Sequence, residues 1–215
     1  MSRPPQPSTL TTPLLLHPWA KPVLWLALAL PALGLMAAAF NNRLGGNPAE
    51  HLIHQTGEWA LRWLWLSLAI TPLRELLKWP ALVRFRRNVG VAAFLYALMH
   101  LLCYAGFDKG WLLDDIVRDV LKRNFILVGM VAFVLMLPLA LTSFNAAIRA
   151  LGGARWRWLH RLAYLIAMLI LLHFYWKKSA KHDTDEVLIY AAVLAVLLGW
   201  RAMRAGSLWK WLLPR

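Results

Sequence analysis

NVGVAAFLYALMHLLCYAGF, from Asn88 to Phe107, is an apolar stretch of twenty residues without Asp, Glu, Lys or Arg. An α-helix rises about 1.5 Å per residue, so a helix of this length crosses about 30 Å, the thickness of the hydrocarbon core of a bilayer. The stretch therefore predicts a membrane-spanning helix. It also places a histidine, His100, inside that span.

Similar apolar segments recur along the chain, of which 60% is hydrophobic and only 16% is charged. That balance is typical of a membrane protein and exceeds what a soluble core of this size needs. We predict an all-α integral membrane fold, a six-transmembrane-helix bundle that forms one domain over residues 22–203. The second span carries Glu58 and Arg62 near its start, and the sixth is short. The spans are expected at about residues 22–40, 52–73, 88–107, 124–144, 157–176 and 186–203.

The distribution of charge predicts how these spans are oriented. If the N-terminus lies in the cytoplasm, the whole formal net charge of +14 falls on cytoplasmic segments, while the outer segments carry nine basic and nine acidic residues. Short cytoplasmic loops are enriched in Lys and Arg, so both termini are predicted to be cytoplasmic. The tails are residues 1–21, which are rich in Pro, Ser and Thr and expected to be disordered, and residues 204–215. Attraction to membrane lipid explains the basic charge without nucleic-acid binding.

Two histidines are predicted to lie well inside spans, where an ionisable group is costly and is a functional candidate by default. His100 lies about 18 Å along the third span from Asn88, and His173 about 25 Å along the fifth span from Trp156. Both depths fall in the outer half of the membrane. A six-coordinate haem needs one imidazole from each side, so we predict that His100 and His173 bind a haem iron together. Hydrogen bonding between helices is the alternative role.

A second, inner site is suggested by His160, which precedes His173 by 13 residues, or about 20 Å of helix. Its partner position on the third span holds Arg86, a poor iron ligand but a good clamp for a haem propionate. On an ideal helix His160 and His173 are about 140° apart, so two haems on one face are not required. The sequence therefore leaves open whether the protein binds one haem or two. His54, at the outer entrance of the second span, is a further candidate for a ligand or a quinone contact.

Several dispersed segments resemble the ferric-reductase-like transmembrane family, and within it the haem-binding membrane subunits of bacterial periplasmic methionine-sulfoxide reductase systems. The resemblance covers nearly the whole chain after the first span. The segments that carry it are NPAEHLIHQTGEWAL from Asn47, ITPLRELL from Ile70, RFRRNVGV from Arg84, ALMHLLCY around His100, LALTSFNAAIRALGGARWRWLHRLAYL ending at Leu165, and LLHFYW around His173.

This resemblance implies a multi-pass protein of the bacterial inner membrane that carries haem b and passes electrons from the quinone pool to a periplasmic partner. The partner implied is a molybdopterin-containing catalytic subunit that reduces methionine sulfoxide in oxidised proteins, the two forming a heterodimer. The resemblance also implies that the protein binds FMN, but it does not indicate which residues bind it. The haem-ligand positions carry over as His100, His160 and His173, while Arg86 departs from the wider family pattern. Two alternatives are another membrane b-type cytochrome and a haem-free transporter of protons or metal ions.

Overall fold

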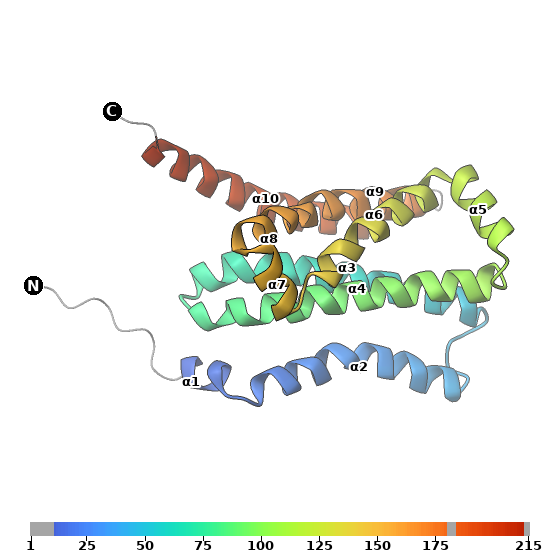
Figure 1. Ribbon diagram of the computed structural model, residues 1–215. Helices are drawn as coiled ribbons and strands as arrows, with labels where there is room; N and C mark the ends of the chain where they lie inside the picture. Colours follow the sequence, from blue (N-terminus) through green and yellow to red (C-terminus); the bar gives the residue numbers. More distant parts are fainter. Residues whose placement is uncertain (1–10, 180–183, 213–215) are drawn as a thin grey trace, which may run out of the picture. The chain divides into compact units, whose positions relative to one another are not determined.

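The computed structural model describes residues 11–179 and 184–212, and within these ranges the chain is almost entirely helical, with no β-strand (Figure 1). It divides into two compact units, Met1–Leu112 and Leu113–Arg215. The elements are α1 (Thr11–Leu16), α2 (Ala20–Phe40), α3 (Pro48–Leu76), the 3₁₀ helix η1 (Pro80–Phe85), α4 (Arg86–Cys103), the π-helical turn η2 (Tyr104–Asp108), α5 (Leu113–Lys122), α6 (Asn124–Leu141), α7 (Asn145–Leu151), α8 (Gly153–Leu159), α9 (Leu162–Ser179) and α10 (Asp185–Leu212).

Five helical segments of the described chain are long and apolar enough to cross a membrane. They correspond to five of the six predicted spans, so the chain is an all-helical membrane protein. The predicted second span forms one continuous helix, α3, but its polar and charged residues, Glu58 and Arg62 among them, make it less apolar than the others. Crossing by α3 and the cytoplasmic location of both termini stay predictions. The five segments are Ala20–Phe40, Pro80–Asp108, Asn124–Leu141, Gly153–Ser179 and Asp185–Arg204.

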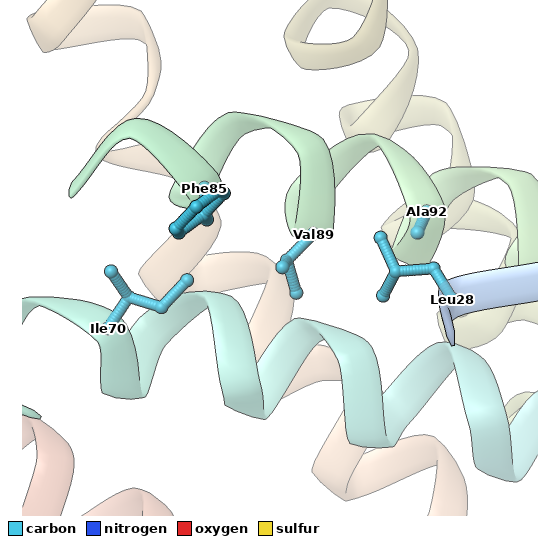
Figure 2. Close-up of a cluster of buried hydrophobic side chains, with 5 residues drawn as sticks. All are labelled: Leu28, Ile70, Phe85, Val89 and Ala92. Carbon is cyan, nitrogen blue, oxygen red and sulfur yellow. The ribbon is translucent and has the colours of Figure 1, made fainter. Parts of the chain in front are cut away.

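In the first unit, α3 and α4 lie side by side and are joined through η1 (Figure 1). A cluster of buried apolar side chains packs between α3 and the η1–α4 segment, and α2 packs against the same cluster. In Figure 2, Phe85, Val89 and Ala92 follow one another along the η1–α4 segment, with Phe85 near Ile70 of α3 and Ala92 near Leu28 of α2. The small Ala92 side chain allows close approach of the helices. Because this packing fixes how far α4 is shifted along α3, it also fixes the position of His100 near the other end of α4.

The proline in the interior of α2, Pro31, is accommodated by a side chain from α4. Next to Pro31, the Tyr96 hydroxyl accepts a hydrogen bond from the amide of Ala32 at 2.9 Å and donates one to the carbonyl of Leu28 at 2.9 Å. That amide and that carbonyl are four residues apart, so in an uninterrupted helix they would bond to each other. The tyrosine therefore inserts into the helix at a point that proline has weakened, and it ties α2 to α4.

The N-terminal segment is more ordered than its composition suggested. Residues 1–10 lie outside the described residues, but Thr11–Leu16 forms the helix α1, where a disordered tail was expected. Leu15 packs against the apolar cluster of the first unit, and its carbonyl accepts a hydrogen bond of 2.8 Å from the Arg84 guanidinium. Burial of an apolar side chain and a charge-assisted hydrogen bond thus offset the entropy cost of ordering this segment.

At its C-terminal end α4 passes directly into the π-helical turn η2, which starts four residues after His100. Gly110 and Trp111 then end the helix with positive φ angles of 56° and 64°. The Trp111 amide donates to the carbonyl of Ala105 at 2.8 Å, and its indole packs so close to Gly106 that a Cβ there would lie 3.0 Å from the ring. Glycine at position 106 is what allows this close turn.

In the second unit, α6 packs against α9, and the α-helix over the predicted fifth span is interrupted near its start, although the segment Gly153–Ser179 as a whole is apolar enough to cross a membrane. Sequence analysis placed one span over residues 157–176, but α8 ends at Leu159 and α9 begins at Leu162. The amides of Arg161 and Tyr164 bond to carbonyls only three residues back, which tightens the chain at this point. The angle of about 140° between His160 and His173, calculated for an ideal helix, therefore does not apply.

Candidate functional site

His100 is held by a backbone carbonyl of the neighbouring helix. Its Nδ1 lies 2.8 Å from the carbonyl oxygen of Ile53, near the start of α3. A carbonyl oxygen can only accept a hydrogen bond, so Nδ1 carries the proton and donates it. The bond therefore fixes both the tautomer and the orientation of the ring, and it leaves Nε2 as the nitrogen with a lone pair for a metal.

The approach of this ring to α3 depends on a glycine. Gly57 stands four residues after Ile53, and a Cβ built on Gly57 would lie 2.9 Å from Nδ1 and 3.1 Å from Cε1 of His100. Such separations are shorter than van der Waals contact, so a larger residue would displace the imidazole. The first unit thus contains a notch in α3 into which the His100 ring fits.

His173 in the second unit is held in the same way. Its Nδ1 donates to the carbonyl of Phe125, at the start of α6, over 2.6 Å, and the rings of Phe125 and His173 are tilted at 39° with centroids 5.9 Å apart. Gly129 lies four residues after Phe125, and a Cβ on it would lie 2.7 Å from Nδ1 of His173. His173 therefore has the tautomer and the glycine notch that His100 has.

This environment fits an axial ligand of a haem. Histidines that bind metals usually donate their other ring nitrogen to a carboxylate or a backbone carbonyl, which sets the tautomer and raises the basicity of the ligating nitrogen. His100 and His173 both make that bond, and both rings are partly buried. Each of the two histidines therefore has the Nδ1 hydrogen bond that is usual for metal-binding histidines, and their role as a ligand pair stays a prediction.

His160 has a different environment. It caps α8, and its Nδ1 lies 3.0 Å from the carbonyl of Trp156 in its own helix. Its ring stacks on the Trp156 indole, with centroids 3.9 Å apart and planes at 27°. The tautomer is again Nδ1–H, because the partner is a carbonyl. Here, however, the orientation comes from the histidine's own helix and from stacking, rather than from a carbonyl and a glycine of a neighbouring helix.

The two remaining candidates make contacts with α3. The Arg86 guanidinium, in the first turn of α4, lies 3.4 Å from the Thr71 hydroxyl of α3. His54 lies one turn after Glu50 on α3, with Nε2 3.6 Å from the carboxylate. Arg86 thus lies at the end of the α3–α4 pair that is opposite to His100, whereas His54 follows directly after the residue whose carbonyl holds His100.

The other histidines in the described part of the chain are less buried than His100 and His173. His17 and His51 are exposed, and His17 accepts a hydrogen bond of 3.3 Å from the Trp19 amide. His182 lies outside the described residues. We expect His17, His51 and His182 to act as polar anchors at the membrane surface.

Sequence reasoning missed the groups that orient the two main histidines. A backbone carbonyl leaves no sign in a sequence, because every residue carries one. The glycines were visible, however: Gly57 and Gly129 interrupt apolar helices, and an isolated glycine in a helix often marks close approach of another group. Which histidine approaches which glycine depended on the pairing of α3 with α4 and of α6 with α9.

Comparison with known proteins shows the family of the chain. The family model described as "Ferric reductase like transmembrane component" matches residues 56–171, a range that contains His100 and His160 and ends two residues before His173. No solved structure matches the chain significantly.

Relatives match over almost the whole chain. A protein of Polaromonas naphthalenivorans, named "Protein-methionine-sulfoxide reductase heme-binding subunit MsrQ", is 54% identical over 187 residues, which are 87% of this chain and 85% of the relative. Proteins with the same name from Ralstonia nicotianae and Herminiimonas arsenicoxydans are 47% and 44% identical, over 86% and 89% of this chain and 88% and 85% of their own lengths. This chain is a multi-pass protein of the bacterial inner membrane that belongs to the ferric-reductase-like transmembrane family and, within it, to the MsrQ group.

Proposed function

We propose that this chain is the haem-binding membrane subunit of a methionine-sulfoxide reductase system, with His100 and His173 as axial ligands of a haem b. The observation that carries the proposal is the matched environment of these two histidines, each with Nδ1 bonded to a backbone carbonyl at 2.8 Å or 2.6 Å. The name of the relatives, heme-binding subunit, supports the same cofactor.

The position of each histidine along its helix also supports the proposal. His100 lies 14 residues after the start of α4 and His173 lies 11 residues after the start of α9, which correspond to about 21 Å and 17 Å of helix. Each ring contacts the first turns of a helix, α3 or α6, that runs in the opposite direction under the six-span topology. Both histidines would then lie towards the outer side of the membrane.

The protein's residues supply ligation and orientation for an electron carrier. Haem b, when bound, supplies a one-electron couple. His100 and His173 offer Nε2 lone pairs in fixed orientations, so little rearrangement is needed between oxidation states. The apolar helices around them exclude water, which limits the energy needed to reorganise the surroundings when charge changes.

The inner end of the protein is proposed to hold a second haem through His160, with Arg86 as the clamp for a propionate. The support is chemical: His160 is oriented by the Trp156 carbonyl, and an arginine binds carboxylates in a bidentate manner. His54, which lies beside Glu50 at the outer entrance of α3, is proposed as a quinone contact.

We further propose that electrons enter from the quinone pool and leave to a periplasmic molybdopterin-containing subunit, with which this chain forms a heterodimer. The relatives are named as subunits of a methionine-sulfoxide reductase, so the site that reduces the sulfoxide is expected on the partner. FMN, which the family resemblance implies, is proposed as a second cofactor without an assignment to residues.

Haem content tests the cofactor and its ligands. Protein purified in detergent from cells with ample haem should give the reduced-minus-oxidised absorbance difference of a b-type haem. His100→Ala and His173→Ala should each lower the haem-to-protein ratio severalfold or more, because each removes one axial bond. His51→Ala, an exposed histidine of α3, is the matched control and should keep the haem. Full retention in both ligand variants would refute the pairing.

Electron transfer tests the role. In liposomes, a reduced quinol should reduce the haem of the wild-type protein, and the reduced haem should be reoxidised when the periplasmic reductase and methionine sulfoxide are added. His160→Ala should slow reduction by quinol if the inner site passes electrons outward. If quinol reduces the haem of His160→Ala as fast as that of the wild type, His160 is not part of the electron pathway.

A further inference from the structure

His100 and His173 lie in different units, yet their surroundings follow one pattern. In each case Nδ1 of the histidine donates to the carbonyl of a residue on the neighbouring helix, and the residue four positions later on that helix is glycine. Two independent occurrences of one arrangement indicate a shared requirement. The residues concerned are Ile53 and Gly57 beside His100, and Phe125 and Gly129 beside His173.

The geometry of the α-helix explains the spacing of four. The carbonyl of each residue points along the axis towards the amide four residues later. A ring that reaches this carbonyl from outside must therefore pass over the Cα of that later residue. A Cβ atom on Gly57 or on Gly129 would lie only 2.9 Å or 2.7 Å from the histidine Nδ1, so any other residue would block the approach.

We infer that Gly57 and Gly129 are positioning residues for the two haem ligands: they open the helix surface so that each histidine reaches its carbonyl. The inference rests on the proposed haem function and deepens it, because it names the residues that orient the ligands. Donation from Nδ1–H to a carbonyl makes Nε2 a stronger electron donor to iron. A stronger donor stabilises the ferric state, so the glycines are expected to keep the haem potential low.

Alanine substitution tests each position separately. In Gly57→Ala and Gly129→Ala the added methyl pushes the imidazole away from its carbonyl, while the histidine itself is retained. Loss of such an orienting bond typically weakens metal binding about 10–100-fold, and we expect that loss in haem affinity. Haem that remains should show a more positive midpoint potential and altered low-spin electron paramagnetic resonance signals.

The chain provides matched controls for these variants. Gly90 in α4 and Gly199 in α10 also lie inside helices, and a Cβ on either would meet nothing within 4 Å. Gly90→Ala and Gly199→Ala should keep the haem content and the potential. If Gly57→Ala and Gly129→Ala match these controls in both, the inference is wrong although the haem function stands. A haem-free wild-type protein would instead overturn the haem function.

A chemical rescue separates the hydrogen bond from general misfolding. In His100→Gly, added imidazole should enter the vacated space, bond the Ile53 carbonyl and restore a low-spin haem spectrum. 1-Methylimidazole has no N–H and should restore it poorly at the same concentration. In His100→Gly combined with Gly57→Ala, imidazole should also fail. Equal rescue by both compounds, or no rescue by imidazole in His100→Gly, counts against the inference.

Discussion

The Tyr96 hydroxyl bridges two backbone groups of α2 that bond directly to each other in a regular helix. It lies between the Leu28 carbonyl and the Ala32 amide at 2.9 Å from each, and only 4% of the Tyr96 residue is exposed. Both backbone groups are therefore satisfied by one side chain in a part of the protein that water does not reach. A buried backbone group that loses its partner keeps the full cost of its desolvation.

Tyr96→Phe should consequently destabilise the protein by about 1–3 kcal/mol, because it leaves those two backbone groups without the bridging oxygen. Thermal unfolding in detergent, followed by circular dichroism, measures the change. Tyr175→Phe is the control, since Tyr175 is 46% exposed, and it should unfold like the wild type. Equal unfolding temperatures for the two variants would show that α2 closes its own hydrogen bonds when the hydroxyl is absent.

The residues that carry the proposed chemistry were accessible to sequence reasoning because charge and polarity are costly in a bilayer. An imidazole inside an apolar stretch stands out, and this alone indicated His100 and His173. The hydroxyl of Tyr96 did not stand out, because tyrosine is common in membrane helices and its partner is backbone. Residue roles that depend on side-chain atoms were predicted, whereas those that depend on backbone atoms of another helix were not.

At the scale of elements, the apolar stretches located the helices well but not their interruptions. The fifth predicted span is broken at His160 and Arg161, although Trp156 to Trp176 contains neither proline nor glycine. The bonds that break it are backbone bonds three residues apart, supported by stacking of His160 on Trp156. The hydrophobic pattern shows which residues avoid water. An α-helix and a tighter 3₁₀ turn satisfy that pattern equally, so the pattern does not reveal the interruption.

The helix α5 was not predicted, and its three faces suggest where it lies. Ile116, Asp119 and Val120 form the least exposed face, while Leu113, Val117 and Leu121 form an apolar face that is 75%, 54% and 71% exposed. A third face carries charge. Short helices with one exposed apolar stripe and one charged face rest in the interface of a membrane, so α5 is expected to lie flat on the outer surface between two spans.

Site-specific labelling tests this position of α5. In a Cys103→Ala background, Val117→Cys and Asp115→Cys place a single thiol on the apolar face or on the charged face of α5. An environment-sensitive fluorophore should emit at shorter wavelength from position 117 than from position 115 when the protein is in lipid nanodiscs. Identical emission from both positions would mean that α5 stands clear of the lipid.

At the scale of the whole molecule, composition and charge determined the class of protein, while the partition into two units was not predicted. The structure forms the compact units Met1–Leu112 and Leu113–Arg215, and the single transmembrane domain expected over residues 22–203 stays a prediction. Each unit contains one helix pair, α3 with α4 or α6 with α9, that orients one histidine. Hydropathy ranks segments by their free energy of transfer out of water. It carries no information about which helices pack against one another.

The helix α3 decides the topology, because a sixth span puts both termini on the same side of the membrane. Its 29 residues extend about 43 Å, which is enough to cross the bilayer. The charges that make it less apolar are paired: the Arg62 guanidinium lies 2.9 Å from the Glu58 carboxylate, one turn apart. A neutralised pair costs less to place in hydrocarbon than separate ions, so we expect α3 to span.

Reporter fusions test that topology. Alkaline phosphatase is active only outside the cytoplasm, and green fluorescent protein fluoresces only inside it. Phosphatase fused after Asn42 or Lys109 should be active, whereas fluorescent protein fused after Lys78, after Arg149 or at the C-terminus should fluoresce. If α3 does not cross, the side changes at Lys78 and at every later position, while Asn42 keeps its side in either case. Phosphatase activity at Lys78 together with fluorescence at Lys109 would therefore overturn the six-span arrangement and, with it, the outer location of His100 and His173.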